Sequence, residues 1–275
     1  MQLIQMTNKL CLKGVKFVLN QIRSIFSYNG LLVNLALKEL RLQYKHSFFG
    51  FLWSMLNPLF MLFIYVFAFK YILHNNVPHF TLFLLIAELP WNFFQGGILS
   101  STNSLVNAAS LISKVYFPRE IIPLSIVASN LFNFIFTLVI LTIAYPISHV
   151  SFNFNMLYFP IVLLSQTLFM IALAIILSVI TVIYRDVYHF MQIILMAWFY
   201  LTPIVYPLSR VPYPMHAFMY LNPMTDFIVE YRLILFHGMS PNWNIMLGTY
   251  AFDLILLIFS LWIFRKLSRN IIEYL

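Results

Sequence analysis

Residues 156–183 read MLYFPIVLLSQTLFMIALAIILSVITVI and contain no charged side chain. A helix needs about 20 mostly apolar residues to cross a bilayer, so this stretch is long enough to span one. Similar stretches recur along the chain. The predicted spans are residues 48–72, 80–104, 121–146, 156–183, 188–207 and 245–264. The sequence therefore predicts an all-α integral membrane protein with six transmembrane helices.

The composition agrees with this fold class. Hydrophobic residues make up 62% of the 275 residues and charged residues only 9%, against about 45–50% and 25% in soluble domains. Such a chain has no room for an ATPase domain or a large external domain. Its single cysteine, Cys11, excludes an intrachain disulfide. The excess of 16 Lys and Arg over 8 Asp and Glu predicts contact with anionic membrane lipids rather than nucleic acid.

The basic residues predict the orientation. Most of them fall on one side of the predicted spans, together with both chain ends. The positive-inside rule therefore places both termini in the cytoplasm. Residues 1–30 resemble a basic amphipathic helix on the inner leaflet, with a loosely ordered basic tail as the alternative. Residues 31–275 then form one transmembrane domain.

The segment 33–46 is predicted to be a cytoplasmic helix with apolar residues on two sides. Its main apolar stripe contains Val33, Ala36, Leu37, Leu40 and Tyr44. Its basic flank contains Lys38, Arg41 and Lys45. Leu35 and Leu42 lie opposite the stripe, where they either meet another segment or are tolerated on the surface.

The connection 113–120 is the second unusual segment. It combines two aromatic residues with charges and a proline, in the sequence Lys114, Val115, Tyr116, Phe117, Pro118, Arg119 and Glu120. A proline can begin a helix, and an acidic residue is favourable near a helix N-terminus. Exposed aromatics with charged neighbours are typical of a docking site. The alternative is that the aromatics fold under the bundle or lie in the headgroup layer.

The third segment follows the fifth predicted span. Five prolines between residues 203 and 223 lead into the apolar segment 224–236, which is too short to span and contains Asp226, Glu230 and Arg232. A helix that dips into the outer leaflet and returns explains this pattern, provided that protein covers its backbone. Arg232 or Lys70 is expected to balance the two acids.

Two acidic residues lie within predicted spans, where charge is costly. Glu88 and Asp253 point either to a proton or ion pathway or to structural hydrogen bonds, and the second interpretation is favoured because the spans supply no basic partner. The second span also contains Pro90, Asn92 and Gln95, so we expect it to be the least lipid-exposed. Mid-span aromatics, such as Phe60, Phe63 and Phe67, either stack on sugar rings or pack against lipid.

Catalytic motifs such as a P-loop or a zinc-binding HExxH are missing from the sequence. Four ordered segments instead resemble polysaccharide-exporting ABC-2 permeases, over residues 31–267. They are LKELRLQYKHS at 37–47 with FGFLW at 49–53 and NP at 57–58, then KVYFPRE at 114–120, then YRD at 184–186 with TPIVY at 202–206, and NPM at 222–224.

The resemblance implies a non-enzymatic transport subunit in a bacterial inner membrane, forming a homodimer that exports a lipid-linked glycan such as O-antigen. ATP and Mg²⁺ would bind to a separate ATPase chain, with no cofactor on this one. The helix 33–46 would be a gate, whose Lys38, Arg41, Tyr44 and Lys45 meet the lipid phosphate.

The resemblance also makes the segment 113–120 a coupling helix for the ATPase and places two short re-entrant helices in 203–236. The candidate residues for the sugar path are Phe60, Phe63, Phe67, Glu88 and Tyr200. Two alternatives remain: an ABC-2 exporter of a drug or small lipid, and an ion-coupled carrier that uses Glu88 and Asp253.

Overall fold

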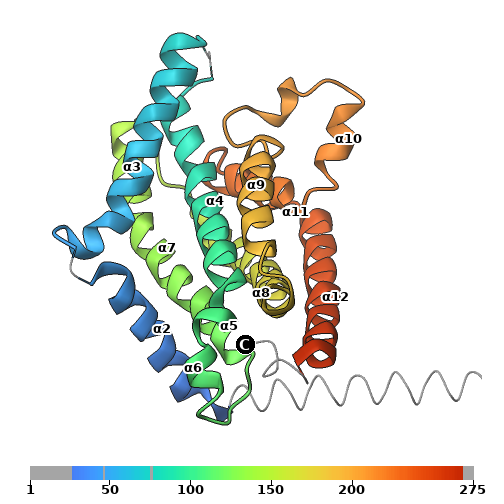
Figure 1. Cartoon of the computed structure of the whole chain (residues 1–275). Coiled ribbons are helices and arrows are strands. Elements are labelled where there is room, and N and C mark those ends of the chain that lie inside the picture. Colours follow the sequence, from blue (N-terminus) through green and yellow to red (C-terminus); the bar gives the residue numbers. More distant parts are fainter. Residues whose placement is uncertain (1–26, 46, 75–76, 269–275) are drawn as a thin grey trace, which may run out of the picture.

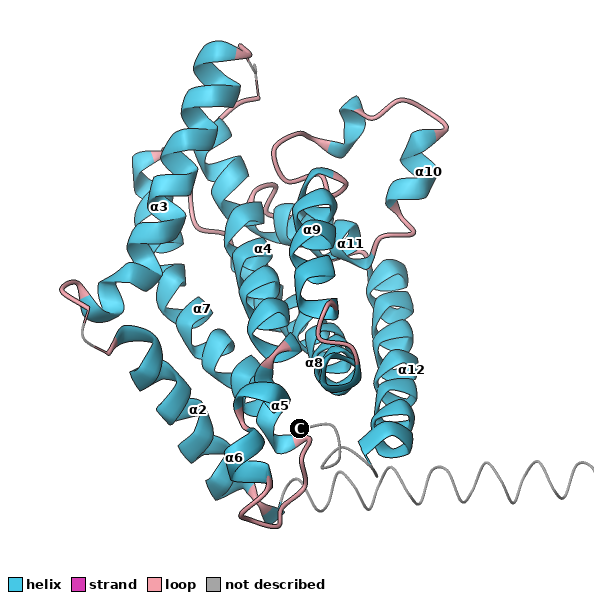
Figure 2. Cartoon of the chain, viewed as in Figure 1, coloured by secondary structure: helices cyan, strands magenta, loops and turns pink. Residues whose placement is uncertain are grey.

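The computed structural model describes residues 27–45, 47–74 and 77–268. Within these residues all regular structure is helical, which confirms the predicted all-α fold (Figures 1 and 2). The helix expected in residues 1–30 lies almost entirely outside the described part. Helix α2 (Asn29–Tyr44) begins and helix α12 (Trp243–Ser268) ends toward the lower end of the bundle in Figure 1.

Five helical stretches are long and apolar enough to cross a membrane: Gly50–Ile72, Phe80–Thr102, Ile121–Ile147, Phe154–Ile183 and Trp243–Ser268. The first joins the 3-10 turn η1 (Gly50–Leu52), α3 (Trp53–Tyr65) and the π-helical η2 (Val66–Ile72). The second is α4 (Phe80–Thr102) and the third is α7 (Ile121–Ile147). The fourth joins η3 (Phe154–Tyr158) to α8 (Phe159–Ile183), and the fifth is α12 (Trp243–Ser268). These five match predicted spans closely.

Shorter helices connect or flank the spans. They are α2 (Asn29–Tyr44), α5 (Ser104–Asn107), α6 (Ala109–Ile112), α9 (Val187–Tyr200), η4 (Leu208–Arg210), α10 (Met215–Met219) and α11 (Pro223–Leu235). In Figure 1, α2, α5 and α6 lie at the lower end of the bundle and α10 at the upper end.

The predicted span 188–207 differs from the structure. Its helix, α9, has 14 residues and ends at Tyr200, so it is about 21 Å long against a hydrocarbon core of about 30 Å. Pro203 has no backbone N–H and disfavours helical geometry in the residue before it. The chain therefore turns over residues 201–206 instead of continuing the helix.

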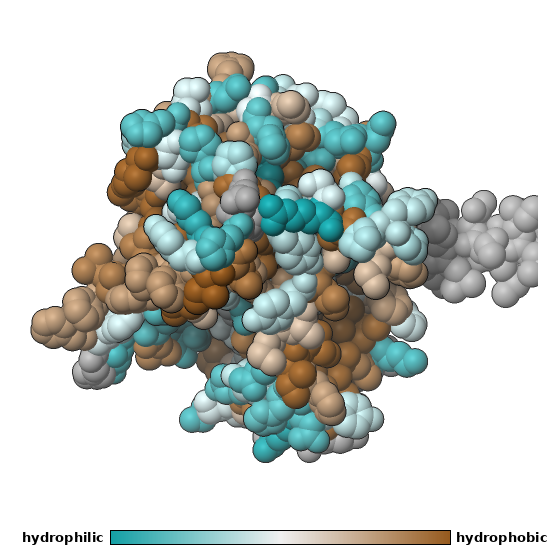
Figure 3. Space-filling model, turned by 90° about the horizontal axis from the view of Figure 1, so that it is seen from above, coloured by the Kyte–Doolittle hydropathy of each residue, from teal (hydrophilic) through white to brown (hydrophobic). Residues whose placement is uncertain are grey.

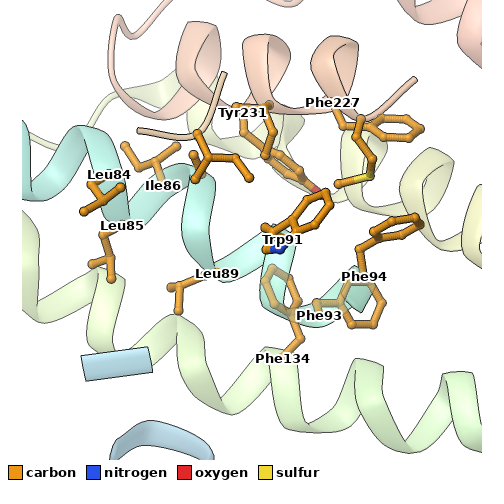
Figure 4. Packing of buried hydrophobic residues seen from close by; sticks show 14 of the residues in the cluster. Leu84, Leu85, Ile86, Leu89, Trp91, Phe93, Phe94, Phe134, Phe227 and Tyr231 are labelled. Atoms are coloured by element: carbon orange, nitrogen blue, oxygen red, sulfur yellow. The ribbon is translucent and has the colours of Figure 1, made fainter. Parts of the chain in front are cut away.

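Helix α4 is the centre of the bundle. It packs against α3, α7, α8, α9 and α11. Most of its residues are buried, including Leu84, Trp91 and Phe94, and it is the most buried of the five spans. This confirms that the second span is the least lipid-exposed. Figure 4 shows Trp91 and Phe94 beside residues of α7 and α11, such as Phe134 and Phe227.

A buried polar bridge connects three helices at this centre. The Gln166 side chain on α8 donates to the Pro90 carbonyl of α4 at 2.8 Å. Its carbonyl oxygen accepts a hydrogen bond from the Tyr231 hydroxyl of α11, also at 2.8 Å. Gln166 and Tyr231 are completely buried. In an environment without water, each of these groups depends on the others for its hydrogen bonds.

A second hydrophobic cluster lies at the lower end of the bundle. It contains Leu105 of α5, Ile121 of α7, Val179 of α8 and Phe264 of α12. Leu35 of α2 packs against this cluster. The cluster therefore joins the short helices of this end to three of the long spans.

We expect Tyr231→Phe to destabilise the bundle, because it leaves the Gln166 carbonyl oxygen buried without its donor. The cost is about 1–3 kcal/mol of unfolding free energy. Thermal unfolding of the purified protein in detergent measures it. The control is Tyr71→Phe, which removes the hydroxyl of an exposed side chain. Equal stability of the two variants would contradict the role given to the bridge.

Candidate functional site

Helix α2 lies along α7. Ala36 is buried and Leu35 packs against the lower cluster, whereas Val33 and Leu37 are exposed. The predicted apolar stripe is therefore divided: Ala36 faces the bundle, and Val33 and Leu37 lie on the surface of the single chain. Leu35 meets another segment, as one alternative proposed, and Leu42 is exposed on the surface.

Three side chains fasten the C-terminal end of α2 to α7. The Tyr44 hydroxyl donates to Asn133 Oδ1 at 3.3 Å, and Asn133 Nδ2 donates to Gln43 Oε1 at 2.9 Å. The Tyr44 ring also meets Phe51 edge to face, with the ring centroids 5.3 Å apart. Tyr44 is thus engaged within the chain, and it joins the predicted gate helix to the third span.

The basic residues of α2, which are Lys38, Arg41 and Lys45, are all exposed. Lys38 also lines a polar cavity of about 380 Å³, between α2 and the lower parts of α4, α5, α6 and α7. Its other polar lining residues are Glu39, Ser100, Asn103, Ser104, Asn107, Ser110, Ser125 and Tyr188. An anionic group in this cavity would therefore be close to the Lys38 side chain.

The connection 113–120 forms turns rather than the expected coupling helix. Pro118 begins the turn into α7, because its carbonyl accepts from the Ile121 N–H at 3.1 Å. Tyr116 is 96% exposed and Phe117 only 5%. Phe117 packs in the lower cluster, so the structure contradicts its role as an exposed contact. The tip of the connection is formed by exposed Lys114, Val115 and Tyr116.

The two charged residues after this tip are less accessible. Arg119 donates to the Ser268 carbonyl at the end of α12. Glu120 is mostly buried at the N-terminus of α7, where a negative charge is favourable. Arg119 therefore ties the connection to the end of α12.

The candidate residues for the sugar path fall into two groups. Phe60 and Phe63 on α3, Phe67 on η2 and Tyr200 at the end of α9 are exposed on the surface of the single chain. Glu88 on α4 is 1% exposed, so it does not line an open path within this chain.

The second acidic residue within a span has a partner. The Asp253 carboxylate on α12 accepts a hydrogen bond from the Ser165 hydroxyl of α8 at 2.6 Å. Asp253 is fully buried and its helix packs closely on α8. This contact supports the structural interpretation of Asp253 rather than an ion pathway.

The segment after α9 contains the two helices α10 and α11. Asn222 caps α11 by accepting from the Met224 N–H at 3.0 Å, and Pro223 is its first residue. Around α10, Tyr213 and Phe218 are strongly exposed. Seen from this end, hydrophobic residues lie among hydrophilic ones (Figure 3).

Arg232 does not balance the acids of α11, contrary to the sequence expectation. Its guanidinium donates to the Pro203 carbonyl and, at 2.6 Å, to the Ile204 carbonyl. The same group lies 3.5 Å from the centre of the Phe83 ring on α4. Lys70, the other candidate, is exposed and lies over the Tyr71 ring.

The acids of α11 are partly or fully buried. Asp226 is half-buried, and Glu230 is buried and accepts from the Asn242 N–H at 3.1 Å. Burial raises the pKa of both carboxyl groups above their usual range, because the charged form loses its water.

A groove that the sequence analysis did not single out lies between α2, α3, α4 and α7. Its volume is about 490 Å³. On α7 its lining includes Asn130, Asn133 and Thr137. Their spacing of three and four residues puts them on one helix face, and this polar stripe within an apolar span is the signal that would have revealed the groove.

Comparison with known proteins gives the family. A model of ABC-2 type transporters matches residues 31–236. The chain belongs to the ABC-2 type transporter family. This confirms the family that the sequence motifs indicated.

Relatives of this ABC-2 chain are similar over nearly their full length. It is 34% identical to the O-antigen export system permease protein RfbA of Myxococcus xanthus over 244 residues, which cover 86% of this chain and 92% of the relative. Two O-antigen export system permease proteins RfbA of Klebsiella pneumoniae are 32% and 30% identical over 246 residues. Each of these alignments covers 89% of this chain and 95% of the relative.

We expect Glu230→Gln to reduce the pH dependence of stability. Because the native pKa of Glu230 is raised, stability is highest at acidic pH and falls as the pH rises from the unfolded pKa, about 4.3, through the native value. A neutral amide removes that loss. Melting temperatures in detergent from about pH 5 to pH 8 test this. Asp186→Asn, at an exposed position, is the control, and an unchanged pH profile for Glu230→Gln would contradict the prediction.

Proposed function

We propose that this chain is the membrane permease subunit of an ATP-driven transporter that exports O-antigen. The observation that carries the proposal is the similarity to three O-antigen export permeases over 86–89% of this chain. Family membership over residues 31–236 supports the same class of transporter. The family match includes the first four long spans and the connection 113–120.

The partner in this proposal is a separate ATPase chain that binds ATP and Mg²⁺. It contacts the tip of the connection 113–120, on the cytoplasmic side of the inner membrane. The exposed Tyr116 ring supports this assignment, because exposed aromatics beside charges are typical interface anchors. A small surface cavity of about 270 Å³ lies beside it, lined partly by Lys114 and Arg119.

The substrate in this proposal is a lipid-linked glycan, which approaches from the inner leaflet. Exposed Arg41 and Lys45 attract its phosphate, and Lys38 lines the polar cavity next to them. Two copies of the chain form the pore. Exposed aromatics of α3 and α9, including Phe63 and Tyr200, face the glycan between the copies. The segment with α10 and α11 forms the re-entrant helices at the outer mouth.

Co-purification with the ATPase tests the proposal. We expect the full chain and the ATPase, co-expressed, to form a complex of two copies of each in detergent. Tyr116→Ala should weaken this association about tenfold or more, as the loss of an interface anchor does. The complex is measured by mass determination and by ATPase titration.

Tyr213→Ala is the matched control, because it truncates a strongly exposed tyrosine just before α10, a helix that lies at the other end of the bundle. This variant should bind the ATPase normally. In cells, deletion of the gene should abolish O-antigen at the surface, and the control variant should restore it. Normal ATPase binding by Tyr116→Ala would contradict the contact, and surface O-antigen without the gene would contradict the function.

A further inference from the structure

The groove between α2, α3, α4 and α7 has an unusual lining for a membrane helix bundle. It contains five carboxamide side chains and no charged one. The carboxamides are Gln43, Asn57, Asn92, Asn130 and Asn133. The aromatic members of the lining are Tyr44, Trp53, Phe60, Phe93 and Phe134. The volume of about 490 Å³ falls within the range of small-molecule sites, roughly 300–1,000 Å³.

The carboxamides divide into a structural group and a free group. Asn133 is engaged with Gln43 and Tyr44, which hold α2 on α7. The Asn130 side chain donates to the Ile126 carbonyl at 2.9 Å, and its side-chain oxygen, Oδ1, lies toward Gly96. Asn57 is exposed, and its side chain forms no hydrogen bond with any described residue. The groove therefore retains unused donors and acceptors.

These groups lie within membrane spans. Asn57 belongs to the span that begins at Gly50 and is about 10 Å along it. Asn92 lies near the middle of α4, is half-buried and has the Glu88 carboxyl group as a neighbour on one side, so part of its hydrogen-bonding capacity remains for the groove. A polar group facing hydrocarbon without a partner is costly. Carboxamides on two neighbouring spans that face one groove therefore indicate an occupant with hydrogen-bonding groups of its own.

The lining also identifies the chemistry of the occupant. A phosphate or carboxylate would find no cation in this groove. A neutral sugar offers hydroxyl groups that both donate and accept, as carboxamides do. Its ring also has apolar faces that pack on aromatic side chains, and Trp53 and Phe60 supply such side chains here.

We infer that this groove binds one neutral sugar ring of a membrane-embedded glycolipid, with Asn57, Asn92 and Asn130 as the hydrogen-bonding residues. The inference rests on the proposed function, because it places the lipid-proximal sugar of the exported glycan there. The absence of Cβ at Gly96 keeps the groove open, since a Cβ there would lie 3.2 Å from Asn130 Oδ1. The charged phosphate stays outside, toward the basic flank of α2.

Photolabelling tests the inference on the full chain in complex with its ATPase, in lipid nanodiscs. The probe is dodecyl β-D-glucoside with a diazirine beside the sugar. We expect labelled peptides from α3 and α7 at the groove. Unlabelled dodecyl maltoside should compete, and dodecylphosphocholine, which has the same chain and a charged headgroup, should not. Asn57→Leu and Asn92→Leu should each reduce labelling roughly fivefold, the effect of one lost hydrogen bond.

Asn34→Leu is the matched control, because it makes the same change at an exposed position of α2 that does not line the groove. Its labelling should equal that of the unmodified chain. Gly96→Ala narrows the groove while keeping every carboxamide, and it should also reduce labelling. Melting temperatures show whether the asparagine variants fold. If one of them does not, Gly96→Ala still tests the inference.

Equal competition by dodecylphosphocholine would overturn the inference and make the groove a lipid-chain surface. Absence of label in the assembled complex would also overturn it, because a second copy or another segment would then cover the groove. Neither result affects the proposed function, which depends on ATPase binding and surface O-antigen. Conversely, surface O-antigen in cells without the gene, together with intact groove labelling, would count against the proposed export of O-antigen and leave the sugar-binding groove in place.

Discussion

The fold depends on satisfying polar groups where water is absent. Gln166 is the clearest case, since its single carboxamide joins the Pro90 carbonyl of α4 to the Tyr231 hydroxyl of α11. Proline inside α4 removes one backbone donor and disturbs the hydrogen-bond ladder around it. A side chain from α8 supplies a hydrogen bond at this position. Because α4 contacts most of the other spans, this bridge fixes the element around which they pack.

At the upper end of the bundle, Arg232 likewise satisfies buried polar groups. The turn after α9 contains carbonyl groups that are not paired within a helix. The Arg232 guanidinium donates hydrogen bonds to two of them, those of Pro203 and Ile204. It also lies against the Phe83 ring of α4. A buried arginine thus covers irregular backbone that could not face lipid. Arg232 thereby holds α11 against the turn that follows α9.

The sequence predicted five spans well because hydropathy over 20 residues is a local property. It was wrong at α9, where the helix ends before Pro203 and the turn that follows is stabilised by Arg232, which lies far along the chain. It did not divide the apolar stripe of α2, in which Ala36 is buried and Val33 and Leu37 are exposed, since an apolar stripe in a membrane protein can face lipid as readily as protein. The adjacent aromatics Tyr116 and Phe117 show a further limit of sequence-based prediction. The sequence identifies the pair, but only the fold determines which of the two rings is buried.

Helix α7 connects the two parts of the candidate site. At its lower end Phe117 packs with α8 and α12 residues, and Arg119 holds the end of α12. Higher up, Asn133 fastens α2, and Asn130 and Asn133 line the carboxamide groove. A force applied at Tyr116 therefore meets a packed cluster rather than a loose loop, and packed cores shift as units instead of deforming gradually. Movement of α7 would carry α2 with it and change the groove wall that faces α3 and α4.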